Sequence, residues 1–88
     1  MKREPKLGDL RVWWIPQIPM KPFLVPVDSY AVARKITKTL AAYDLFQFEN
    51  KVKPDYSNAG GVEYFDGEDW LSVDDEEEFE EIMREMRR

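Results

Sequence analysis

Four prolines within eleven residues, at positions 16, 19, 22 and 26, constrain the fold of this 88-residue chain more than any other feature. A proline has no amide hydrogen to donate, and its ring fixes the φ angle at about −65°. The stretch therefore cannot form a helix or a central strand of a sheet. We predict a loop over residues 17–22 and then a short strand over residues 23–27 at the edge of a sheet.

A first strand is predicted before the prolines, over residues 7–15, which are rich in β-branched and aromatic side chains. Successive side chains of a strand point to opposite faces, so Val12 and Trp14 should share one face and Trp13 should lie on the other. Each face of this strand then carries a tryptophan. We expect at least one of the two to be only partly buried.

A helix should begin at Asp28 or Ser29, because both side chains can accept hydrogen bonds from the first free amides of a helix. Apolar residues then recur at helical spacing and predict the face that packs on the core: Val32, Ala33, Ile36, Leu40 and Tyr43. Residues 44–50 either continue this helix or form a second short turn.

The rest of the chain predicts a loop, a hairpin and a second helix. Residues 53–61 are a loop by composition, and residues 62–65 and 70–73 flank a turn that contains Asp66-Gly67. Residues 74–88 form an acidic amphipathic helix, with one apolar stripe: Phe79, Ile82, Met83 and Met86.

These elements predict one domain over residues 1–88, of the α+β class. It combines a mainly antiparallel sheet of three to four strands with one central helix and the acidic C-terminal helix. Residues 1–6 and the last few residues are expected to fray.

The composition argues against catalysis. The chain contains no cysteine and no histidine, so disulfides, thiolate zinc sites, the usual general base and the commonest metal ligand are all absent. Gly60-Gly61 alone does not make a phosphate-binding loop, and no apolar run is long enough to span a membrane. We predict no catalytic residues, no metal and no cofactor, and hence a protein that is not an enzyme.

The tryptophan–proline segment is the best candidate for a protein-binding surface. Prolines reduce the entropy lost on binding, and aromatic rings give a large contact area for few rotatable bonds. Together with the second loop, this segment supplies the expected partner-binding residues: Trp13, Trp14, Gln17, Tyr56 and Asn58.

The charge is divided unevenly along the chain. Residues 1–65 hold ten Lys/Arg and seven Asp/Glu, whereas residues 66–88 hold three Arg and eleven Asp/Glu. The acids allow two interpretations. They favour the start of a helix and keep the domain soluble, or they imitate a phosphate backbone and fill the basic groove of a nucleic-acid-binding protein. The candidate mimic face comprises Asp69, Asp74, Asp75, Glu78 and Glu81. The same charge opposes direct binding of nucleic acid.

Two stretches, residues 6–23 (KLGDLRVWWIPQIPMKPF) and residues 43–61 (YDLFQFENKVKPDYSNAGG), resemble small proteins of tailed bacteriophages and prophages that are labelled superinfection exclusion proteins. The resemblance covers residues 6–73 and brings no catalytic or binding residues with it. It implies a phage-encoded protein in the bacterial host cytoplasm that hinders a second phage.

Two modes of action follow from this resemblance and from the charge. The first is contact with a protein of the host or of the superinfecting phage, and the alternative is an acidic mimic that inhibits a host nuclease or defence complex. The thin core of so short a chain and its amphipathic terminal helix are also compatible with a homodimer.

Overall fold

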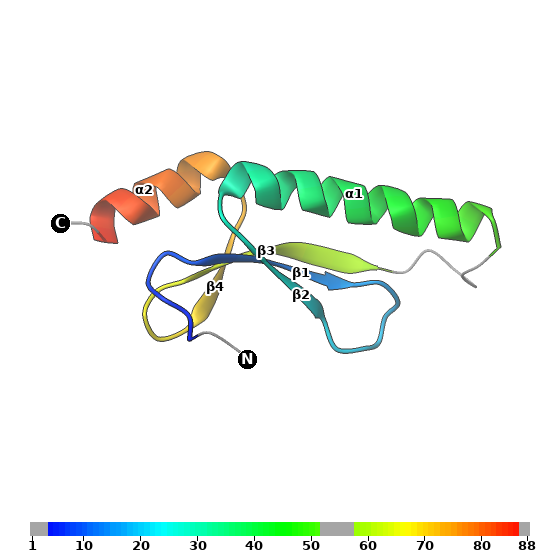
Figure 1. Cartoon of the computed structure of the whole chain (residues 1–88), viewed down its shortest axis with the longest axis horizontal. Helices are drawn as coiled ribbons and strands as arrows, with labels where there is room; N and C mark the ends of the chain where they lie inside the picture. The colour runs from blue at the N-terminus through cyan, green and yellow to red at the C-terminus, as the bar shows by residue number, and fades with distance from the viewer. Residues whose placement is uncertain (1–3, 52–57, 87–88) are drawn as a thin grey trace.

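A computed structural model describes residues 4–51 and 58–86 of the chain, which contain six regular elements (Figure 1). In chain order these are β1 (Leu10–Ile15), β2 (Phe23–Val27), α1 (Tyr30–Glu49), β3 (Ala59–Phe65), β4 (Trp70–Val73) and α2 (Glu76–Met86). The strands form one antiparallel sheet in the order β2-β1-β3-β4. The α+β class predicted from the sequence is therefore confirmed.

Strand β2, which contains Pro26, lies at an edge of the sheet, as the proline-rich stretch predicts. Within the described sheet β2 pairs with β1 alone, in a register that sets Leu24 opposite Trp13 and Pro26 opposite Arg11. An edge tolerates proline because one side of the strand has no neighbour that needs its amide hydrogen. The chain reaches β2 through residues 16–22, which include a cis peptide between Ile18 and Pro19.

The core lies between one face of the sheet and the two helices, which Figure 1 shows on the same side of it. Val12, at the centre of β1, is fully buried. The cluster around it takes residues from three strands and from α1: Leu10, Tyr30, Ala33, Val62, Tyr64 and Val73. In the described parts of the chain no helix covers the opposite face, which we call the open face.

Helix α1 is continuous to Glu49, which settles the alternatives left open for residues 44–50. Ser29 caps it, since its Oγ accepts a hydrogen bond from the Val32 amide at 3.2 Å. The predicted core face was partly wrong, because Val32 and Tyr43 are exposed. The buried residues Tyr30 and Ala33 set the phase of the helix on the sheet, and Val32 lies about 100° away from Ala33 around its axis.

Helix α2 begins at Glu76, two residues later than predicted, because Asp75 caps it. The Asp75 Oδ1 accepts a hydrogen bond from the Glu78 amide at 2.7 Å, and the Asp75 carbonyl accepts one from the Phe79 amide at 3.1 Å. The apolar stripe predicted for this helix packs against the core. The ring of Phe79 lies 6.2 Å from that of Tyr30 and 6.4 Å from that of Tyr64, between centroids.

The turn between β3 and β4 is held by one carboxylate. The Asp66 Oδ1 accepts hydrogen bonds from the amides of Asp69, at 2.7 Å, and Glu68, at 2.8 Å. These two amides stabilise the charged form and lower the pKa of Asp66 below its usual value. Gly67 follows with a φ angle of 106°, which glycine adopts without strain. The predicted hairpin is thus confirmed, together with its turn.

The packing of α2 predicts unequal effects for two phenylalanines. Phe79→Ala should lower the free energy of unfolding by about 2 kcal/mol, less than for a fully buried phenylalanine because Phe79 is only partly buried. Phe46→Ala, on the outer side of α1, is the control and should change it by less than about 0.5 kcal/mol. Urea denaturation followed by circular dichroism measures both, and equal losses would show that α2 does not pack as described.

Candidate functional site: the hairpin surface and the β3 groove

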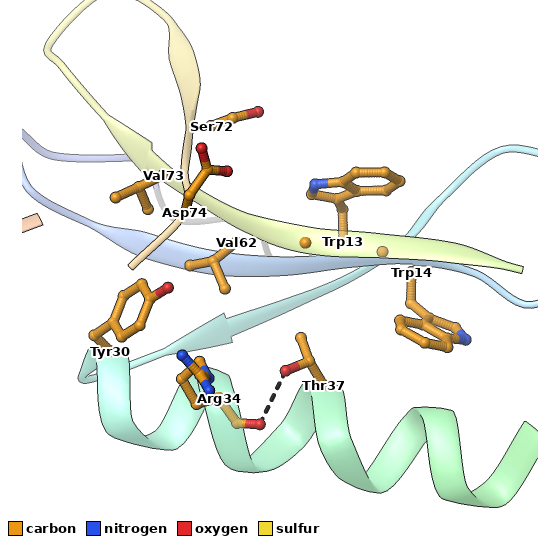
Figure 2. A pocket seen from close by; sticks show the side chains of 11 residues that line it. Trp13, Trp14, Tyr30, Arg34, Thr37, Val62, Ser72, Val73 and Asp74 are labelled. Atoms are coloured by element: carbon orange, nitrogen blue, oxygen red, sulfur yellow. Dashed lines mark hydrogen bonds between the residues drawn. The ribbon is translucent and has the colours of Figure 1, made fainter. Parts of the chain in front are cut away.

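The neighbouring tryptophans of β1 lie on opposite faces of the sheet (Figure 2). Trp14 points toward α1 and is buried, whereas Trp13 lies on the open face and is partly exposed. The predicted division of the two faces is correct. Of this pair, therefore, Trp13 is the one that can meet a partner without unfolding the core.

Trp14 is tied to α1 by a buried carboxylate that sequence reasoning missed. The Trp14 indole Nε1 donates a hydrogen bond to the Asp44 Oδ2 at 2.8 Å, and the Asn58 Nδ2 donates to the same oxygen at 3.1 Å. Asp44 is only 3% exposed. This network joins β1, α1 and the residue before β3, so Trp14 and Asn58 hold the fold together in this structure.

Two glycines of β3 let the tryptophan rings lie flat against the sheet. A Cβ at Gly60 would overlap the ring of Trp14, and a Cβ at Gly61 would come within 2.9 Å of the Trp13 Nε1. The two residues were predicted to end a loop, but they belong to β3, opposite Trp14 and Trp13. The sequence signal for this role was the pair Trp13-Trp14 in β1, the strand that pairs with β3. A bulky ring on each face of the sheet leaves room only for a neighbour without a side chain.

The centre of the open face is held by an ion pair, a cation–π contact and a pair of tilted rings. The Arg11 Nε lies 2.8 Å from the Glu63 Oε1, and the Arg11 guanidinium lies 4.0 Å from the centre of the Trp70 ring. The rings of Trp70 and Phe65 are 5.3 Å apart between centroids. This part of the open face already has its polar groups paired.

Apolar side chains are exposed at the β1–β2 hairpin, as they also are along the second half of α1. Trp13 and Leu24 are direct neighbours across the two strands, and Ile18 and Met20 are exposed in the connecting loop. We call these four residues the hairpin surface. Gln17, also predicted as a contact residue, is partly buried in the same loop, and Tyr56 lies outside the described residues.

A groove with a volume of about 340 Å³ lies at the edge of β3 beside α1, with Trp13 and Ser72 lining it from the open face. Figure 2 shows Tyr30, Arg34 and Thr37 along its helix side and Val62 on its sheet side. Asp74 lies at the end where β4 stops. We call this hollow the β3 groove.

The acids predicted as a mimic face do not share one role. Asp75 caps α2, and Glu78 is partly buried and supplies the amide that this cap binds. Asp69, Asp74 and Glu81 are exposed. Within residues 4–51 and 58–86, no three carboxylates group so as to hold a metal ion, and neither helix is long and apolar enough to cross a membrane.

Comparison with known proteins gives one consistent result. The model of a family described as superinfection exclusion gene product 17 matches residues 9–88. A curated superinfection exclusion protein of Salmonella phage P22 is 54% identical over 57 residues, which are 65% of this chain and 55% of the relative. The chain thus spans about half the length of that relative. No solved structure matches the chain.

The buried carboxylate predicts an energetic coupling between two elements. Asp44→Ala should lower the free energy of unfolding by roughly 1–3 kcal/mol, because it leaves the Trp14 indole N–H buried without this acceptor. Trp14→Phe removes the donor, so the two losses should fall short of additivity by about 1 kcal/mol in the double variant. Glu49→Ala, an exposed acid of the same helix, is the control. Strict additivity in urea denaturation would contradict the hydrogen bond.

Proposed function

The chain belongs to the superinfection exclusion gene product 17 family, and from this membership we propose that it hinders superinfection by binding a protein of the bacterial host or of the incoming phage. It acts in the host cytoplasm and catalyses no reaction. The P22 relative, described as a superinfection exclusion protein, supports the biological role. The proposal of a protein contact rests on one structural observation, the hairpin surface.

The hairpin surface has the composition of a protein-binding patch. Ile18 is 48% exposed, Met20 50% and Leu24 43%, and the partly exposed ring of Trp13 lies beside Leu24. Tryptophan and methionine are enriched in protein interfaces, and tryptophan is a frequent source of their binding energy. The prolines around Ile18 and Met20 restrict the loop before binding, which reduces the entropy lost on association.

The placement of the four predicted contact residues that the structure describes refines this surface. Trp13 remains at its centre and Gln17 at its rim. Trp14 and Asn58 act through the Asp44 network and support the hairpin from beneath. A homodimer, expected from the thin core and the amphipathic terminal helix, remains a prediction, which sedimentation would test.

The acidic mimic is a second candidate, supported by three of its five residues. Asp69, Asp74 and Glu81 are exposed, and no hydrogen bond or ion pair among the described residues engages their carboxylates. Carboxylates free in this way can face a basic groove, where complementary charge raises the rate of association. Asp75 is less informative in a test, because its replacement also removes the cap of α2.

The hairpin surface predicts a loss of exclusion without a loss of folding. The variant with Met20→Ser and Leu24→Thr should weaken partner binding by roughly tenfold, since it removes two apolar contacts. The measurement is the plating efficiency of a panel of tailed phages, P22 among them, on Salmonella cells that produce the protein. The variant should restore plating. The control is Phe46→Ser, which replaces an exposed apolar side chain on α1 and should not restore plating.

A third variant separates the two modes of action. Asp69→Lys with Glu81→Lys should leave exclusion intact if the hairpin surface binds the partner, and should abolish it if the protein is an acidic mimic. Circular dichroism confirms that each variant is folded. If the unaltered protein excludes no phage of the panel, the proposed role in superinfection is overturned.

A further inference from the structure

Strand β3 is longer than the neighbour that pairs with it on its outer side. Strand β4 pairs with residues 62–65 only, and after Val73 the chain turns away toward α2. Residues 59–61 pair with β1 on one side. On the other side, no strand of the described residues continues the ladder.

The backbone groups of Gly60 point toward this open edge. The Phe65 amide donates to the Asp9 carbonyl at 2.9 Å, and the Phe65 carbonyl accepts from the Gly8 amide at 2.8 Å, both on the β1 side. Successive residues of a strand direct their amide and carbonyl groups to alternate edges. Counting back along the unbroken register from Phe65, the N–H and C=O of Gly60 face away from β1. Gly60 is also exposed.

The open edge borders the β3 groove. Gly60 and Gly61 line it together with Trp14, and the residues of α1 form its opposite wall (Figure 2). A segment that pairs with Gly60 would lie where β4 would have continued. Its side chains would alternate between the groove and the open face of the sheet.

One cation and one carboxylate line the groove, Arg34 on the helix side and Asp74 at the end of β4 (Figure 2). Arg34 lies on the helix wall of the groove, and within the described residues its guanidinium takes part in no ion pair. Gly60 is directed toward the α1 side, because a Cβ there would meet Trp14. Residues directly opposite in an antiparallel pair point to the same face. The residue that pairs with Gly60 therefore points into the groove, on the side where Arg34 lies.

We propose that the β3 edge at Gly60 binds an extended acidic segment of a partner protein as an added strand, with an acidic side chain opposite Gly60 entering the groove that Arg34 lines. The backbone of Gly60 supplies the two hydrogen bonds of a strand pair, and Arg34 supplies the charge preference. Addition of a strand to a free sheet edge is an established mode of peptide recognition. This site goes beyond the proposed function, because it uses the edge of β3 and not the β1–β2 loop, although Trp13 of the hairpin surface also lines the groove.

The test uses a defined peptide and the whole protein. The probe is acetyl-Val-Thr-Glu-Thr-Val-amide, titrated against isotope-labelled protein while amide resonances are followed by NMR. The Gly60 amide should shift, and its exchange with solvent should slow, because it becomes a donor in a strand pair. A peptide with lysine in place of the central glutamate should bind roughly threefold to fivefold more weakly, as should the glutamate peptide to Arg34→Gln.

Two controls make the test specific. Methylation of the central peptide nitrogen removes the donor to the Gly60 carbonyl and should abolish binding, and Lys35→Gln, next to Arg34 but outside the groove, should leave the affinity unchanged. A Gly60 amide that does not respond to the glutamate peptide, or equal binding of the lysine peptide, would overturn the proposal. Neither result would affect the phage-plating test, which depends on the hairpin surface.

Discussion

The hydrogen bond from the Trp14 indole to the buried Asp44 carboxylate is the interaction on which the arrangement of this small domain depends. It fixes the far half of α1 over β1, at a distance from the Val12 core where few other buried side chains join helix and sheet. A buried carboxylate is costly unless it is hydrogen-bonded, so its partners must stay in place. Asn58, as the second donor to the same oxygen, also fixes the entry into β3.

This constraint determines which parts of the sheet remain available for binding. With Trp14 held beneath α1, the alternation of β1 places Trp13 on the open face beside Leu24. The ring of Trp14 lies against Gly60, and the ring of Trp13 lies against Gly61 on the other face. Because the glycines have no side chains, the β3 edge is accessible from the groove. The hairpin surface and the β3 edge thus lie on opposite sides of β1. Of the exposed acids near α2, Asp74 lines the β3 groove, whereas Asp69 and Glu81 belong to neither surface.

Much of the fold follows from local sequence signals, and the site follows only in part. Pro26 and the prolines before it predict that β2 is an edge strand, and the stripe of α2 predicts its packed face. Both predictions are confirmed because each depends on a property of one segment. The prediction of the core face of α1 was partly wrong. Val32 fits a helical stripe in the sequence, but its neighbour Ala33 is the residue that packs on the sheet. Asp44 could not be identified, because a polar residue within an apolar helix pattern does not reveal its partner thirty positions away.

The exchange of the tryptophan indole protons with solvent tests this arrangement most directly. NMR in deuterated water resolves the indole N–H signals of Trp13 and Trp14 once they are assigned. Because the Trp14 N–H is buried and bonded to Asp44, its exchange requires local or global opening, and it should be at least about 100-fold slower than that of Trp13. Equal rates, or slower exchange at Trp13, would show that Trp14 is not held in the core by Asp44.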